Sequence, residues 1–164
     1  MYKLVVSALA LLALPALGEE AIITGNVESK CQINTDINGV FGNPTAGTLS
    51  TLPADGGVMP IIRYDVALGD AYTARVIAPN NFSTSPTLND IVVWTSDVEV
   101  SEVSDTAMAD YETDKIQYEY TTEFDLHTAG TTWFKVTSKA EYGYGKSFPG
   151  GQYRAIVLAE CIAK

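Results

Sequence analysis

Alternation of apolar and polar residues is the strongest structural constraint in this sequence. Between residues 115 and 127, Ile116, Tyr118, Tyr120, Phe124 and Leu126 fall on one parity, with mostly charged or polar residues between them. Successive side chains of a β-strand point to opposite faces, so this spacing predicts a strand with one buried and one solvated face. That pattern is typical of antiparallel sheets that cover a core on one side only.

The same period recurs through most of the chain. Strands are predicted at residues 23–33, 61–66, 72–78, 91–100, 115–127, 131–142 and 152–163. Apolar residues occupy both parities of the last of these, which predicts that both of its faces are covered. Loops rich in Gly, Pro, Thr or Asn are predicted at residues 42–57, 80–89 and 143–151.

One segment departs from the strand pattern. Residues 104–115 predict a short helix, with Ser104 as its cap and with Ala107, Met108 and Tyr111 on one face. About seven strands, frequent turns and a single helix predict an all-β fold, an immunoglobulin-like antiparallel β-sandwich with one short helix.

The first 18 residues have the pattern of a secretory signal peptide. Lys3 precedes an apolar run from Leu4 to Leu14, Pro15 follows, and Ala16-Leu17-Gly18 supplies a small-x-small cleavage site. An uncleaved membrane anchor is the alternative, but this run is short for a bilayer of ~30 Å. We therefore expect a single domain over residues 19–164, no membrane insertion after cleavage, and a periplasmic, extracellular or cell-surface location.

Export bears on the two cysteines, Cys31 and Cys161. An oxidising compartment favours a disulfide between them, and two cysteines allow one pairing only. Two buried free thiols are the alternative. A metal site is disfavoured because the chain has no CxxC or HxxxH spacing.

The charge balance limits the partners. The 164 residues include 20 Asp and Glu against 10 Lys and Arg, a formal net charge of -10. Nucleic acid and anionic membrane surfaces both require a basic face, so neither is expected as a partner.

Two end motifs carry a family resemblance. Gly25-Asn26-Val27-Glu28-Ser29-Lys30-Cys31-Gln32-Ile33, followed by Val40-Phe41-Gly42, resembles the opening of secreted bacterial pilin-type domains, namely spore coat protein U and the archaic chaperone–usher pilins. Residues 149–157 resemble their closing strand. The resemblance implies a sandwich that lacks one strand and accepts a neighbour's N-terminal extension by β-strand addition. It implies other protein subunits as partners, including further copies of this chain.

Several residues are candidates for a chemical site. Asn34, Asp36 and Asn38 before Gly39 match the first half of a calcium loop, but Thr45 stands where a bidentate Glu is needed, and a hairpin turn at Asn38-Gly39 explains the motif equally well. The acidic residues of 104–115 predict a solvated helix surface. His127 lacks a GxSxG partner motif, and no nucleotide-binding or zinc-protease motif occurs.

The sequence thus predicts no catalytic residue and no cofactor. The leading hypothesis is a non-enzymatic structural or surface-assembly protein that associates through strand edges, including Ile22, Ile23 and Val27. The alternative is an extracellular carbohydrate- or surface-binding module that uses Trp133, Tyr142 and Tyr144 as exposed aromatic rings.

Overall fold

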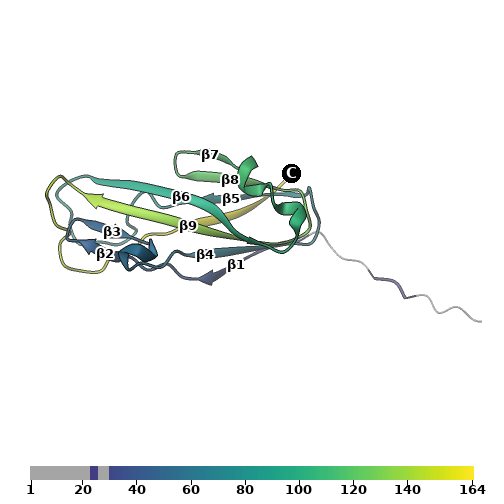
Figure 1. Ribbon diagram of the computed structural model, residues 1–164, viewed down its shortest axis with the longest axis horizontal. Coiled ribbons are helices and arrows are strands. Elements are labelled where there is room, and N and C mark those ends of the chain that lie inside the picture. The colour runs from purple at the N-terminus through teal and green to yellow at the C-terminus, as the bar shows by residue number, and fades with distance from the viewer. Residues whose placement is uncertain (1–22, 26–29) are drawn as a thin grey trace, which may run out of the picture.

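Two antiparallel β-sheets packed face to face form the body of the protein (Figure 1). The computed structural model describes residues 23–25 and 30–164. In the first sheet the order is β1 (Cys31–Ile37), β4 (Ile61–Val66), β9 (Gly130–Tyr142), β3 (Thr48–Ser50) and β2 (Gly42–Thr45), with β6 (Val92–Val103) on the other side of β9. In the second the order is β10 (Leu158–Ala163), β5 (Tyr72–Ile77), β8 (Thr121–Leu126) and β7 (Ile116–Tyr118). The predicted all-β sandwich with one short helix, α1 (Tyr111–Asp114), is confirmed.

The long strand β9 organises the first sheet. β6 pairs with it from Thr132 to Tyr142 on one side. On the other side β9 pairs first with β4, up to Lys135, and then with β3, from Lys139 onward. Residues 136–138 lie between these two pairings, and no described strand pairs with them on this side of β9. We call this gap in the first sheet the notch.

The core has two parts. The larger cluster lies between the sheets and includes the fully buried Tyr64, Phe124 and Phe134. The smaller one surrounds Trp94 and Leu49 at the opposite end and is mainly aromatic, with Phe82 in edge-on contact with four other rings. The notch in the first sheet lies between the two clusters.

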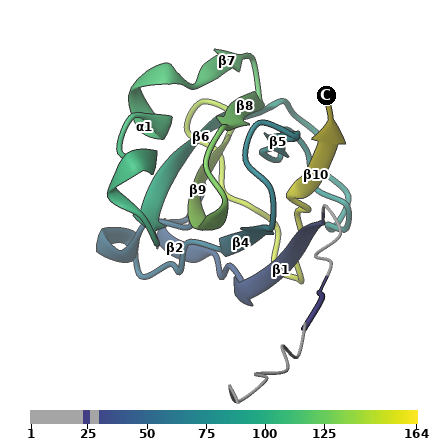
Figure 2. The same cartoon turned by 90° about the vertical axis from the view of Figure 1, so that its right-hand side faces the viewer.

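Cys31 and Cys161 form a disulfide, as predicted. It joins β1 to β10, which are edge strands of different sheets. Figure 2 shows these two strands side by side at one corner of the sandwich.

Several element boundaries differ from the prediction. The first strand begins at Cys31, and the described residues 23–25 are irregular and exposed. The expected loop 42–57 contains β2, β3 and the 3₁₀ turn η1 (Pro53–Asp55). The expected helix 104–115 is broken into the 3₁₀ turn η2 (Thr106–Met108) and the four-residue α1, and Asp105, not Ser104, caps η2 through Ala107 N.

Two predicted strands are shorter than expected. The strand at 115–127 breaks at Glu119, whose φ of 51° turns the chain between β7 and β8. Ile116 and Tyr118 are therefore exposed, contrary to the predicted inner row, whereas Phe124 and Leu126 are buried as predicted. The last strand pairs only from Leu158, and Ile156 and Leu158 are half exposed, so its second face is not covered as predicted.

Among the described residues, no helix has both the length and the apolar character to cross a bilayer.

Candidate functional site

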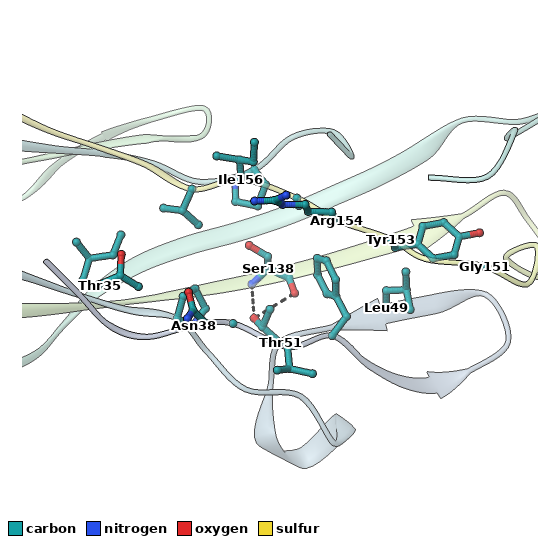
Figure 3. Close-up of a pocket in the computed structure, with 17 residues that line it drawn as sticks. Thr35, Asn38, Leu49, Thr51, Ser138, Gly151, Tyr153, Arg154 and Ile156 are labelled. Carbon is teal, nitrogen blue, oxygen red and sulfur yellow. Dashed lines mark hydrogen bonds between the residues drawn. The ribbon is translucent and has the colours of Figure 1, made fainter. Parts of the chain in front are cut away.

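A groove of about 600 Å³ opens beside the notch in the first sheet (Figure 3). One wall is the end of β1 and the turn after it, including Thr35, Asn38 and Val40. The other wall is residues 151–157, which lead into β10. The Cys31–Cys161 disulfide joins β1 to β10, the strands from which the two walls continue. The groove residues follow Cys31 on one wall and precede Cys161 on the other, so the two walls run in opposite chain directions.

The floor of the groove is the inner face of the first sheet. Leu49 and Ile62 supply buried apolar surface. Between them the Thr51 hydroxyl accepts a hydrogen bond from Ser138 N at 2.8 Å, and Thr51 N donates to Ser138 O at 2.9 Å (Figure 3). These bonds satisfy the β9 backbone at the notch, so the floor presents apolar side chains beside hydroxyl groups that are already hydrogen-bonded.

Both walls have unpaired backbone. β1 pairs with β4 on one side and, within residues 30–164, has no strand partner on the side of the groove. Across the groove, Arg154 bonds outward to Thr84, but Ala155, Ile156 and Val157 make no backbone hydrogen bond to other described residues. Two extended segments with free N–H and C=O groups therefore border one apolar floor, which is the geometry that accepts a β-strand.

The opposite edge of the first sheet is closed by side chains. The Lys115 ammonium donates to Val98 O at 2.8 Å, and the Glu112 carboxylate accepts from Val100 N at 2.7 Å. These two side chains also pair with each other at 2.6 Å. Charged side chains that bind an edge backbone prevent a further strand from pairing there.

Two of the three predicted assembly residues lie outside the described residues. Ile22 and Val27 are not among the described residues, whereas Ile23 is described and is 97% exposed. Arg154, Ile156 and Val40 line the groove but are not among the site residues that the sequence predicts. The sequence signal for this wall is the outer parity of the last predicted strand, where Ile156 and Leu158 are apolar, and that pattern predicts a covered strand instead.

The predicted aromatic patch is not formed. Tyr142 is buried, stacks on Phe148 with ring centroids 5.1 Å apart, and accepts a hydrogen bond from Asn89 N, so its expected exposure is wrong. Trp133 is half buried on the outer face of β9, about 30 Å along the strand from Tyr142. Tyr144 is fully exposed in the loop beyond. Three rings so placed cannot stack on one sugar.

The calcium candidate lies on a strand and its turn, not in a loop. Asn34 and Asp36 belong to β1, where Asn34 donates to Asp65. Asp36 accepts from Trp133 Nε1 at 2.8 Å and pairs with Arg63 at 3.3 Å. Asn38 lines the groove instead. Among the described residues, no group of three or more His, Cys, Asp and Glu side chains is placed to hold a metal ion.

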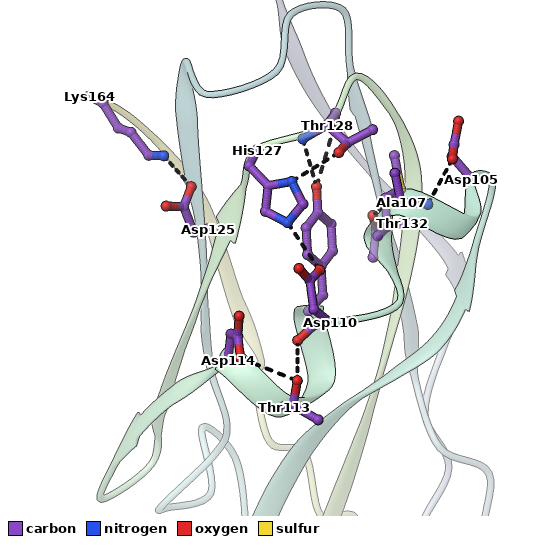
Figure 4. Close-up of polar contacts among 12 residues, drawn as sticks. Asp105, Ala107, Asp110, Thr113, Asp114, Asp125, His127, Thr128, Thr132 and Lys164 are labelled. Carbon is purple, nitrogen blue, oxygen red and sulfur yellow. Dashed lines mark hydrogen bonds and ion pairs between the residues drawn. The ribbon is translucent and has the colours of Figure 1, made fainter.

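His127 lies between a hydroxyl and a carboxylate (Figure 4). Its Nδ1 is 2.9 Å from Thr128 Oγ1 and its Nε2 is 3.0 Å from Asp110 Oδ1. The ring also contacts Tyr111 edge-on, and Thr128 N donates to the Tyr111 hydroxyl. A hydrolytic triad needs its hydroxyl beside a substrate site, and the groove is lined by none of these residues. The contacts fasten α1 to the turn between β8 and β9.

No protein-family model and no curated protein sequence matches this chain.

Proposed function

We propose that this chain is a non-enzymatic structural subunit, exported from the cell, whose copies assemble by adding a strand at the groove between β1 and residues 151–157. The pair of open backbone edges above an apolar floor is the observation that carries the proposal. Strand addition uses main-chain hydrogen bonds for affinity and side-chain pockets for selection, and the groove offers both.

The closure of β6 supports this choice of site. Lys115 and Glu112 occupy the backbone groups that a partner strand would need on that edge. Two other edge strands are short, with four residues in β2 and three in β7, and the six-residue edge strand β10 continues from one wall of the groove. The groove thus combines two extended edges without the side-chain closure seen at β6.

The N-terminal segment of a second copy is the strand that we propose for the groove. Because β1 begins at Cys31, residues 19–30 precede the first strand of the described fold, and such a segment has a fully extended length of about 40 Å. Ile23 is almost fully exposed and is not packed against the described residues of its own copy. To fill its own groove, the segment would have to reverse at Lys30 and pass the Cys31–Cys161 bridge, which joins the two walls.

The disulfide supports export, because such bonds persist in oxidising compartments. The signal-peptide pattern of residues 1–18 supports the same location. Strand addition from a neighbour is also what the resemblance to spore coat protein U and archaic pilins implies.

The test is the mass of the mature chain in solution, by light scattering after gel filtration, together with electron microscopy. We expect concentration-dependent multimers or filaments from the wild type. Deleting residues 19–24 should leave monomers. Ile23→Asp should do the same, because it places a carboxylate against the apolar floor, whereas the matched control Thr24→Asp puts the same charge on the opposite face and should still assemble. A wild type that stays monomeric at all concentrations would overturn the proposal.

A further inference from the structure

Arg154 is the one described basic residue without a partner. Seven of the other Lys and Arg side chains are in ion pairs with carboxylates, and Lys30 also has an interaction. The Arg154 guanidinium has no hydrogen bond or ion pair with any described residue. In a chain with twice as many acidic as basic residues, an unpaired guanidinium is an unused site for a carboxylate.

The unpaired charge of Arg154 lies at the groove. Arg154 lines the wall formed by residues 151–157, and its side chain extends along the groove toward Ile156 (Figure 3). Along this wall Tyr153, Ala155 and Val157 are half buried, while Arg154 and Ile156 are exposed. If a strand were added beside this wall, its outward-facing side chains would lie next to the Arg154 cation and, two residues further along, next to the apolar side chain of Ile156.

The N-terminal segment has the complementary order. Glu20 and Ile22 share one parity, two residues apart, and Ala21 and Ile23 share the other. A parallel pairing that sets Glu20 beside Arg154 also sets Ile22 beside Ile156 and directs Ile23 toward the floor. The groove residues follow Cys31 on one wall and precede Cys161 on the other, so this sense runs antiparallel to β1, which is a regular pairing direction for that wall as well.

We propose that Arg154 selects the incoming strand by binding the Glu20 carboxylate of a second copy, which fixes the register of strand addition. This inference rests on the proposed function and adds to it a named pair of residues. The guanidinium can bind a carboxylate through two parallel hydrogen bonds, which gives a defined geometry as well as attraction.

A charge-swap experiment on the mature full-length chain tests the pair. Arg154→Glu and Glu20→Arg should each weaken self-association about tenfold, and the double variant should recover most of the loss. Arg154→Gln should weaken association less and reduce its dependence on salt. Lys139→Glu, on the outer face of β9, makes the same charge change away from the groove and should have little effect. Circular dichroism checks that each variant is folded.

The outcomes separate this inference from the proposed function. If Arg154→Glu assembles like the wild type while Ile23→Asp does not, strand addition stands and the role of Arg154 is overturned. If Glu28→Arg, and not Glu20→Arg, restores Arg154→Glu, the proposed register is wrong. If Ile23→Asp also assembles normally, strand addition itself fails.

Discussion

The buried hydroxyl of Thr122 is an isolated polar group in the core. Its Oγ1 has no hydrogen-bond partner in the described part of the chain, and the side chain is fully buried on β8. Removing an unsatisfied buried hydroxyl while keeping the shape of the side chain relieves a desolvation cost. We expect Thr122→Val to raise the free energy of unfolding by about 1 kcal/mol in urea titrations.

Thr51→Val is the matched control for Thr122→Val. Thr51 Oγ1 accepts from Ser138 N, so this change leaves a buried N–H without its partner and should lower stability by about 1–2 kcal/mol. Equal changes in unfolding free energy for the two variants would contradict the conclusion that the Thr122 hydroxyl is unsatisfied while the Thr51 hydroxyl is hydrogen-bonded.

The Tyr64 phenol couples stability to alkaline pH. Burial raises the pKa of Tyr64 above its ordinary value, and the hydroxyl donates to the backbone oxygens of Arg75 and Glu160. The pKa of Tyr64 is higher in the folded than in the unfolded chain. The contribution of the protonated phenol to the free energy of unfolding is therefore complete below about pH 10 and is lost as pH rises further. Tyr64→Phe should make the fall in unfolding free energy between pH 9 and 11 shallower, whereas Tyr144→Phe, at a fully exposed ring, should not.

Residue burial was predictable wherever strand parity held. Thr132, Phe134, Val136 and Ala140 are buried on β9, as their alternation indicates. Tyr142 continues the same parity, but the glycines that follow it suggested an exposed loop ring. Strand parity was the better guide, because β9 keeps its pairing with β6 to that residue.

At the scale of elements, the segment between β6 and β8, which contains α1, protects the free edge of β6. We expect Glu112→Ala to remove the acceptor of Val100 N and the partner of Lys115 together, with a loss of about 1–2 kcal/mol in unfolding free energy. The freed β6 edge should also increase aggregation, measured by light scattering during slow heating. Glu99→Ala breaks the more exposed pair with Lys135 and should cost less than about 1 kcal/mol without added aggregation.

Element boundaries were less predictable than strand parity, for local physical reasons. The alternation over 115–127 continues through a turn, because Glu119 adopts positive φ without a Gly or Pro to mark it. Likewise residues 152–157 have a strand pattern but no strand beside them, since pairing with β5 stops at Ile77. Apolar alternation indicates an extended chain that contacts a core, but it does not indicate on which sides that chain finds a strand partner. The groove exists because β1 and residues 155–157 have no described strand partner on the sides that face it.

On the scale of the whole molecule, one covalent bond ties the two sheets together at the closed end of the groove. The Cys31–Cys161 bridge closes a separation of 130 residues, for which loop-closure entropy gives about 4–5 kcal/mol. Replacing both cysteines by Ser should lower the urea midpoint accordingly, and dithiothreitol should do the same to the wild type but leave the Ser variant unchanged. Self-association of the Ser variant should fall as well, because β1 and residues 151–157 would no longer be held at a fixed separation. This is measured without urea, where circular dichroism shows that the variant is folded. A double variant that is less stable but assembles with unchanged affinity would show that the bridge maintains the fold without shaping the groove.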